Sequence, residues 1–453
     1  MGKPRLLVVE IGTFCDFQWM DTALYGLSER YDLHILTNEG RVVPSWVKGV
    51  YTVKTPAWVL KDIDHMPFKS DTDLKYTMTM DAYKHAEGYN WYSRLGALIQ
   101  SVYEELNPVG FVVHYGIIGT LMWIPPEALR IPIIVLYYCP AFVNTTTPYP
   151  FDSILKNTSF DLYSNTKQYH TLVANSWKRW EYFYTLIGWN SFSALKSFLS
   201  KLEHVVCYDS HITPPVTPLY KSFKVHHLGS IYADAKLESK RWYSPDHGRS
   251  PPESLARFLK QRRPILTMSF GSYLMSYQLL KILPFLVEAT VGCGYAIVFH
   301  ASVGAADVAK LRPLVETSPY VHLHPGWLPY EWIVPKSNKI MFTGSICLQT
   351  VCLYNQTPMI FVPMLAEQFF WARNYEFMTR YEKPLTKSAT PVQTTGVPFV
   401  NYNDSESVQL SNLVRALLGE FPGVPLYLKS VGESMRKRDG KQELAQLVHS
   451  LCG

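Results

Sequence analysis

Short apolar runs alternate along the chain with longer amphipathic stretches, which is the pattern of β-strands alternating with α-helices. Runs without polar interruption indicate strands buried on both faces, as in a parallel sheet. In the first half of the chain the predicted strands cover residues 6–11, 33–37, 111–114, 131–138, 204–208 and 224–228. We expect helices over 20–30 and 126–129, and loops with short helices over 40–95. The opening β-turn-α-β pattern predicts a Rossmann-like domain.

The second half of the chain repeats this alternation. Its predicted strands cover residues 264–270, 295–300, 320–323, 339–342 and 358–362, and helices are expected over 278–289, over 308–315 and from about 344. Residues 233–263 are rich in charge and proline and hold no apolar strand, although a helix is expected to begin near 251. Because 453 residues exceed one compact domain, we predict four parts. These are a domain at 1–232, a linker at 233–263, a domain at 264–425 and a C-terminal helix at 426–453.

Composition narrows the class of protein without assigning a function. Hydrophobic residues make up 47% of the chain and charged residues 18%, as in a soluble globular protein. The net charge of +6 is scattered, and the basic run at 436–438 is short, so nucleic-acid binding is not expected. No stretch reaches the length of a membrane span, and the apolar run at 6–11 is too short for the core of a signal peptide. We expect a cytoplasmic protein, with peripheral membrane contact left open.

Cysteine and aromatic residues add two further limits. The 7 cysteines lie far apart without a C-x-x-C pair, so neither a zinc site nor a disulfide framework is indicated. The 30 Tyr, 22 Phe and 12 Trp residues suit flat apolar or sugar ligands, and they suit ordinary packing as well. Residues 177–198 carry bulky apolar side chains at roughly helical spacing. The sequence leaves open whether this stretch packs in the core, covers an acceptor or takes up a lipid from a membrane.

The stretch 327–371 holds the densest candidate chemistry. A predicted strand at 339–342 is followed by Gly344 and Ser345, where the next helix is expected to begin. Free backbone N–H groups at such a helix start attract phosphate. After the following strand, Glu367 and Gln368 fall at the same edge of the sheet, where polar side chains bind ligand hydroxyls. Taken alone, the pattern also fits an ordinary βαβ unit with a polar rim.

Two motifs in this stretch resemble motifs of sterol glucosyltransferases. Residues 329–335, PYEWIVP, resemble Pro-His-Asp-Trp-Leu-Phe-Pro, and residues 367–371, EQFFW, resemble Asp-Gln-x-Phe-Trp. The spacing between the motifs also fits, and matches extend over nearly the whole chain. This resemblance to sterol 3-beta-glucosyltransferase-like UDP-glycosyltransferases implies the GT-B fold, in which two Rossmann-like α/β domains face a cleft and a C-terminal helix crosses back to the first domain. It implies that the first domain binds the acceptor and the second binds the nucleotide sugar.

On the acceptor side the resemblance rests on residues 12–19. Their sequence, GTFCDFQW, resembles the family's Gly-Thr/Ser-Arg-Gly-Asp-Val-Gln-Pro. The match implies that Asp16 is the general base, because inverting transfer needs a carboxylate or imidazole within reach of the attacking hydroxyl. Gly12 and Gln18 are retained beside it, and His114, at the end of a predicted strand, is either an aid to the base or an ordinary rim residue. An aspartate in this position can instead cap the following helix.

On the donor side the resemblance assigns residues at the ends of several predicted strands. Gly271 and Ser272 match the family's small-residue turn beside the diphosphate. Trp327 resembles a tryptophan of plant-type glycosyltransferases that stacks on uracil. The full set of expected donor-binding residues is Gly271, Ser272, Trp327, Tyr330, Thr343, Gly344, Ser345, Glu367 and Gln368.

The diphosphate signature of the family is altered in this chain. Where the family has His-His-Gly-Gly-Ala-Gly-Thr-Thr, residues 342–349 are FTGSICLQ. Thr343 stands in place of a phosphate-binding histidine, and Ile346 and Cys347 are larger than their counterparts. Thr343 and Ser345 still donate hydrogen bonds, but a neutral donor stabilises a departing diphosphate less than a cation does. Donor binding has therefore been either rebuilt or lost.

The leading hypothesis is a metal-independent inverting glycosyltransferase. By the resemblance it moves a hexose, expected to be glucose, from a UDP-sugar to a hydroxyl of a sterol or other lipophilic acceptor. No cofactor other than the UDP-sugar co-substrate is expected. The second hypothesis is a degenerate GT-B protein that has lost transfer and serves as a lipid-binding or scaffold module. A third is a transferase with a natural-product acceptor.

Overall fold

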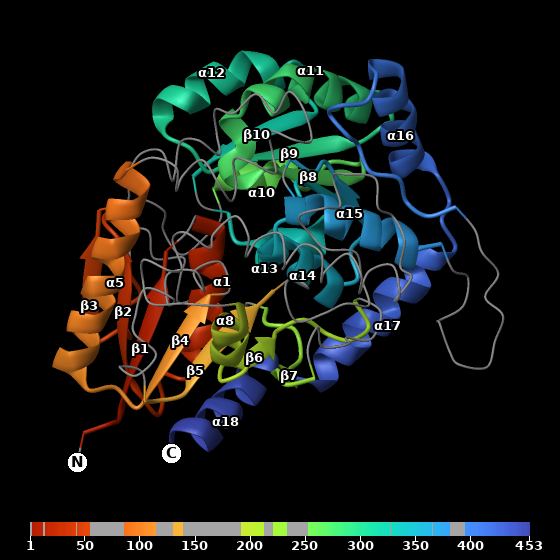
Figure 1. Cartoon of the computed structure of the whole chain (residues 1–453). Helices are drawn as coiled ribbons and strands as arrows, with labels where there is room; N and C mark the ends of the chain where they lie inside the picture. Colours follow the sequence, from red (N-terminus) through yellow and green to blue (C-terminus); the bar gives the residue numbers. More distant parts are fainter. Residues whose placement is uncertain are drawn as a thin grey trace, which may run out of the picture. The chain divides into compact units, whose positions relative to one another are not determined.

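The computed structural model of the chain describes residues 2–11, 14–41, 43–54, 86–114, 130–138, 192–212, 221–232, 252–326, 328–364, 366–380 and 395–453. The chain forms two compact units. The first consists of Met1–Ile231 together with Arg438–Gly453, and the second of Tyr232–Lys437. Each unit contains one parallel β-sheet (Figure 1).

The sheet of the first unit has seven strands in the order β3-β2-β1-β4-β5-β6-β7. The strands are β1 (Arg5–Glu10), β2 (Asp32–Asn38), β3 (Gly49–Val53), β4 (Gly110–His114), β5 (Ile133–Tyr137), β6 (Glu203–Val206) and β7 (Lys224–His227). Every residue of β4, β5 and β6 is buried. This agrees with the prediction from their unbroken apolar runs that these strands belong to a parallel sheet covered on both faces. The prediction of six strands in this half is confirmed, and β3 is an additional one.

Four helices of this unit are described, namely α1 (Phe14–Tyr25), α5 (Ala86–Leu106), α8 (Phe192–Leu199) and α18 (Gly440–Cys452). The expectation of only loops and short helices over 40–95 is wrong for two segments, β3 and the first half of α5. The strand β3 lies at the edge of the sheet with no fully buried residue, so it has no apolar run. The first half of α5 contains Gly88 and Asn90, which weaken a helical pattern.

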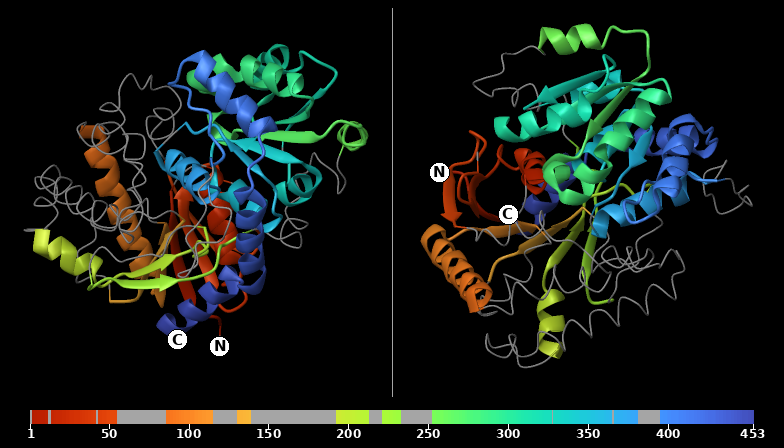
Figure 2. Two further views of the ribbon diagram at one scale, coloured as in Figure 1. Left: turned by 90° about the vertical axis from the view of Figure 1, so that its right-hand side faces the viewer. Right: turned by 90° about the horizontal axis from the view of Figure 1, so that it is seen from above.

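The carboxyl-terminal stretch 426–453 forms two helices, where one was expected. The first, α17 (Gly423–Lys437), belongs to the second unit, and α18 belongs to the first. The break falls at Asp439, whose carboxylate caps α18 by accepting hydrogen bonds from the N–H groups at its start. Helix α18 packs against α1 (Figure 2). The chain therefore returns to its first unit, as the fold class predicted.

The sheet of the second unit has five parallel strands in the order β10-β9-β8-β11-β12. The strands are β8 (Ile265–Ser269), β9 (Ala296–Ala301), β10 (Val321–Pro325), β11 (Lys339–Phe342) and β12 (Met359–Phe361). The helices are α10 (Glu253–Phe258), α11 (Tyr277–Gly292), α12 (Ala305–Val315), α13 (Tyr330–Ile333), α14 (Ile346–Tyr354), α15 (Ala366–Met378), α16 (Glu406–Leu418) and α17. Helices α11 and α12 lie side by side next to β9 and β10 (Figure 1). Among the described helices of the chain, none is long and apolar enough to cross a bilayer.

The stretch 233–263 contains an element of this second unit. Helix α10 packs on β10, and its Leu255 is fully buried. Residues 233–251, the rest of the predicted linker, lie outside the described part of the chain, as do the helix expected at 126–129 and most of the aromatic stretch 177–198.

In each sheet the strand order reverses beside the first strand of the unit. The reversal falls between β1 and β4 in the first sheet and between β8 and β11 in the second. Ligands of open α/β sheets bind at the carboxyl ends of the strands at such a point. At the first reversal, Asp16 follows β1 and His114 ends β4. At the second, Gly271 follows β8 and Gly344 follows β11.

Candidate active site

The connection from β11 to α14 is the best-defined part of the candidate site. Gly344 has a backbone φ of +113°, a conformation that residues with a side chain rarely adopt. A Cβ atom on Gly344 would lie 3.2 Å from both Cα and Cβ of Gln368, so the two segments are in contact. Ser345 is the N-cap residue of α14, and its side chain makes no capping hydrogen bond. The N–H groups of the first turn of α14, which have no partner within the helix, therefore begin beside Gln368.

Gln368 lies in the first turn of α15 and is only 4% exposed. Its Oε1 accepts a hydrogen bond of 2.8 Å from the N–H of Met364, which fixes the plane of the amide. The two strand-to-helix connections thus lie at the same edge of the sheet, as predicted, and the structure brings Gly344 and Gln368 into contact there. Thr343, at the position of the family's histidine, is buried.

A chain of hydrogen bonds lies on the other side of the strand-order reversal. Ser269 Oγ is 2.9 Å from His300 Nδ1 and 3.0 Å from the Tyr330 hydroxyl, and His300 Nε2 is 2.9 Å from the Gly326 carbonyl oxygen. Burial lowers the pKa of His300 to about 4, so this imidazole is neutral at pH 7. The sequence named Tyr330 as a candidate but missed Ser269 and His300. No pattern distinguishes a buried polar residue within an apolar run.

Asp16 lies in the first turn of α1, where a loop was expected. Helix α1 begins at Phe14, earlier than the expected start at residue 20. As the third residue of the helix, Asp16 does not occupy the N-cap position, so the capping alternative is wrong. A carboxylate in the first turn is nevertheless favourable to the helix dipole.

His114, at the end of β4, is packed in an aromatic cluster. Its ring stacks on Tyr138, with centroids 5.1 Å apart, and meets the edge of Trp19 at 6.3 Å. All three side chains are buried. The structure therefore places His114 at the predicted edge of the sheet, within the packing between α1, β4 and the end of β5.

A buried ionic cluster, which no pattern in the sequence indicated, fixes α1 to the same edge. The guanidinium of Arg41 donates to Glu10 Oε2 at 2.6 Å and to Asp21 Oδ1 at 2.5 Å. Glu10 ends β1, Asp21 lies on α1, and Arg41 follows β2. Since a buried guanidinium paired with two carboxylates holds a specific geometry, this cluster sets the position of α1, which carries Asp16.

Several candidate residues lie partly or wholly outside the described structure. Gly12 and Trp327 are not described, and for Asp16, Gln18, Ser272 and Glu367 only the backbone is. Gly271, with φ of +57°, begins a short 3-10 turn after β8. Among the described residues, no group of three or more His, Cys, Asp or Glu side chains could hold a metal ion.

Comparison with known proteins identifies the fold. No protein-family model matches the chain, and no curated protein matches it in sequence. The glycotransferase of kitacinnamycin matches 100% of both chains at 12% identity with a TM-score of 0.63. Glycosyltransferase SsfS6 of Streptomyces sp. SF2575 matches 98% of this chain and 99% of its own at 13% identity, with a TM-score of 0.57. The Phytolacca americana enzyme UGT2, solved with UDP-2-fluoro-glucose and pterostilbene, matches 99% of each chain at 12% identity, with a TM-score of 0.59. The chain has the GT-B fold.

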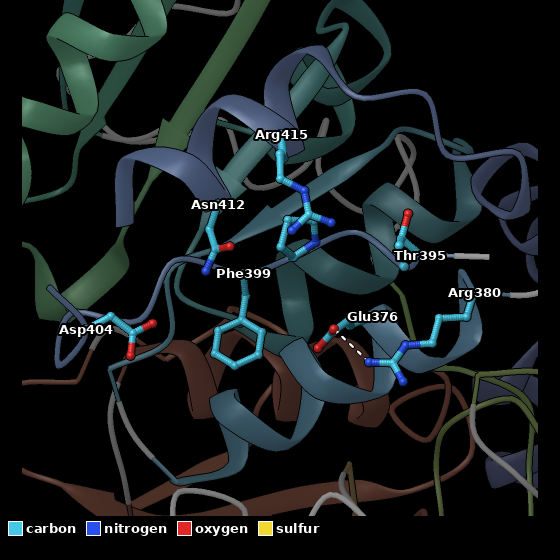
Figure 3. Close-up of a pocket in the computed structure, with 9 residues that line it drawn as sticks. Glu376, Arg380, Thr395, Phe399, Asp404, Asn412 and Arg415 are labelled. Atoms are coloured by element: carbon cyan, nitrogen blue, oxygen red, sulfur yellow. Dashed lines mark hydrogen bonds and ion pairs between the residues drawn. The ribbon is translucent and has the colours of Figure 1, made fainter. Parts of the chain in front are cut away.

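A cavity of about 370 Å³ in the second unit of this GT-B chain is not part of the candidate site. It lies between the end of α15, residues 395–404 and α16, and a Glu376–Arg380 ion pair of 2.8 Å forms one wall (Figure 3). Glu376 lies two helical turns beyond Gln368, roughly 12 Å along α15 at the usual helical rise. The cavity and the Gly344–Gln368 contact are therefore separate features of the second unit.

Proposed function

We propose that this GT-B chain is an inverting, metal-independent glycosyltransferase. It transfers a hexose, glucose by the resemblance, from a UDP-sugar to a hydroxyl of a sterol or other lipophilic acceptor. The observation that carries the proposal is the contact between Gly344 and Gln368 at the start of α14. It joins a phosphate-binding helix start to an amide that can bind sugar hydroxyls, at the edge of the sheet where nucleotides bind in α/β folds.

The donor is held by groups of three kinds. The N–H groups of α14, together with Ser345, Thr343 and the turn at Gly271-Ser272, bind the diphosphate. Glu367 and Gln368 bind the hydroxyls of the sugar, and Trp327 stacks on the uracil ring. Because fixed N–H dipoles at a helix start balance phosphate charge, this arrangement can stabilise the departing UDP without a divalent metal. Gln368 is already fixed by its bond to Met364, so little reorganisation is needed when the sugar binds.

The acceptor hydroxyl is activated on the first unit. Asp16 takes its proton while the oxygen attacks the anomeric carbon, the bond from that carbon to the UDP oxygen breaks, and the configuration inverts. Gly12, Gln18 and His114 border the acceptor. Two features support this role for Asp16. It lies in the first turn of α1 after β1, and Arg41 holds α1 against that end of the sheet.

The ligands of the solved neighbours support a nucleotide-sugar donor for this chain, but they do not single out one class of acceptor. UGT2 was solved with UDP-2-fluoro-glucose and pterostilbene, and SsfS6 was also solved with thymidine diphosphate. A natural-product acceptor is therefore a second choice beside a sterol. The neutral Thr343 and the bulky Ile346 and Cys347 at the start of α14 favour the other alternative, a lipid-binding or scaffold protein without transfer.

Calorimetric titration with UDP-glucose, UDP and thymidine diphosphate, without added metal, tests the proposal. We expect saturable binding of UDP-glucose that weakens about tenfold or more in Gln368→Ala, because a buried amide that contacts the ligand is lost. Gln409→Ala is the matched control, since Gln409 is also a buried glutamine of this unit and bonds backbone carbonyls near α16. Asp16→Asn should keep donor binding and lose transfer. Absence of binding for all three nucleotides would reject the enzyme and favour the lipid-binding alternative.

A further inference from the structure

A buried hydrogen-bond chain lies beneath the loop that connects β10 to α13. It runs from the Tyr330 hydroxyl through Ser269 Oγ and the two nitrogens of His300 to the Gly326 carbonyl. Ser269 and His300 are only 3% and 4% exposed, and they are paired in the register of β8 and β9. All of these residues belong to the second unit.

The direction of each bond follows from the chemistry of its atoms. The Gly326 carbonyl can only accept, so the proton of His300 is on Nε2. Burial is the main reason that the pKa of His300 falls to about 4, and Nδ1 therefore carries no proton at pH 7. Nδ1 accepts from the Ser269 hydroxyl, and Ser269 Oγ in turn accepts from Tyr330. The one proton of the Tyr330 hydroxyl thus points into the protein.

This chain fixes both ends of the loop 326–330. Gly326 is held through its carbonyl by His300 and through its N–H by the Ala301 carbonyl at 3.0 Å, and it has a φ of +83°. Tyr330 is held through its hydroxyl at the start of α13. Trp327 lies between these two fixed points in the sequence. A loop that is held before the ligand arrives loses less conformational entropy on binding, which strengthens selective recognition.

We propose that Ser269 and His300 are positioning residues for the nucleobase end of the donor site. By holding the loop 326–330 they set the preference of the protein for one nucleobase over another. The inference rests on the proposed function, which places Trp327 against uracil. Of the groups proposed for the diphosphate, those at α14 lie across the strand-order reversal from this chain. The turn at Gly271-Ser272 follows β8 but is not a member of the chain from Tyr330 to Gly326. The two ends of the donor should therefore respond differently when the chain is broken.

Ser269→Ala and Tyr330→Phe each break the chain with the loss of one hydroxyl. In each variant we expect the Kd for UDP to rise about tenfold, the size of one lost buried hydrogen bond, and the preference for UDP over ADP to decrease. The Kd for inorganic pyrophosphate should stay the same. Thr267→Val is the matched control, because Thr267 is a buried hydroxyl two residues earlier on β8 that bonds Ser337 at 2.8 Å. It should bind all three ligands as the wild type does.

A double-mutant cycle with Trp327→Ala sharpens this titration experiment. Once the indole is removed, Ser269→Ala should weaken UDP binding no further, since the loop then has no ring to position. Equal losses of UDP and pyrophosphate in Ser269→Ala and Tyr330→Phe, or no loss of either, would overturn the inference and leave the proposed function standing. Wild-type protein that binds pyrophosphate but shows no preference for UDP would also overturn it. Wild-type protein that binds neither ligand would overturn both.

Discussion

Two buried histidines, one in each unit, have the same hydrogen-bond surroundings. His204 accepts at Nδ1 from the Tyr137 hydroxyl, 2.9 Å away, and donates through Nε2 to the Leu199 carbonyl at 2.8 Å. His300 has a serine hydroxyl and the Gly326 carbonyl in the equivalent places. Burial lowers the pKa of each to about 4. Both side chains are therefore neutral at pH 7 and resist protonation as long as the chain is folded.

This resistance predicts that stability decreases as the pH falls from 7 to 5. In the unfolded chain a histidine has a pKa near 6.5, so it takes up a proton at a higher pH than in the folded chain. Protonation therefore stabilises the unfolded state more than the folded state, and the free energy of unfolding decreases as the pH falls through 6.5 toward 4. Between pH 7 and pH 5, each histidine lowers the free energy of unfolding by about 2 kcal/mol. Urea unfolding at the two pH values measures the loss, which should be smaller in His204→Gln than in the wild type.

The neighbours of His204 do not mimic this effect. Burial alone would raise the pKa of the adjacent Glu203, but hydrogen bonds from Lys224 and His226 outweigh it and lower that pKa. The stability contributed by Glu203 is therefore lost mainly below pH 5. His449→Gln, at an exposed position on α18, is the control and should keep the wild-type dependence on pH. Equal losses of stability in His204→Gln and in the wild type would contradict the assignment.

At the scale of single elements, the start of α14 depends on a glycine. Gly344→Ala would add a Cβ atom 3.2 Å from Gln368 on a backbone with φ of +113°, so the turn must shift. If this turn holds the diphosphate, the Kd for UDP should rise at least about tenfold in calorimetric titration. Gly292→Ala, in the last turn of α11 with no atom within 4 Å of the added Cβ, is the control. Unchanged UDP binding in Gly344→Ala would place the diphosphate elsewhere.

The strands could be predicted from the sequence more reliably than the helix ends. A parallel strand covered on both faces is an unbroken apolar run, which is why β4, β5, β8 and β9 lie where they were expected. The edge strand β3 has no such run. Helix ends depend on single capping groups. The capping pattern formed by Asp439 and Gln442, three residues apart, was present in the sequence and marks the division between α17 and α18.

The candidate site could be predicted where it lies on strand-to-helix connections. Gly344 and Gln368 were expected at the same edge of the sheet, because the carboxyl ends of parallel strands share an edge, and the structure shows in addition that they are in contact. The polar residues within apolar strands could not be found in this way. Ser269 on β8 and His300 on β9 form a hydrogen bond with each other, and Glu10 forms an ion pair with Arg41. Such pairings depend on strand order, which a linear pattern does not contain.

At the scale of the whole molecule, the last helix completes the first unit. A Cβ atom on Gly110, the first residue of β4, would lie 2.5 Å from Cys452 Sγ, so the end of α18 closes tightly on the sheet. The start of α18 is fastened after β7, where Glu443 accepts a hydrogen bond of 2.9 Å from the N–H of Gly229. Arg438 donates to the other oxygen of Glu443 at 2.9 Å. The helix therefore spans from the end of β7 to the start of β4, and the core of this unit is incomplete without it.

Because α18 packs on the sheet of the first unit, a destabilising substitution in α18 should lower the local stability of the first unit and not of the second. Val448 is fully buried on α18, so Val448→Asp places a carboxylate in the core and should cost several kcal/mol, about 3 or more. Hydrogen exchange should then accelerate in β1 and β4 and stay slow in β8 and β9. Gln446→Asp puts the same charge on an exposed position of the same helix and should leave both sheets protected. If Val448→Asp accelerated exchange equally in both sheets, the two units would unfold as one, and the second would draw its stability from the first.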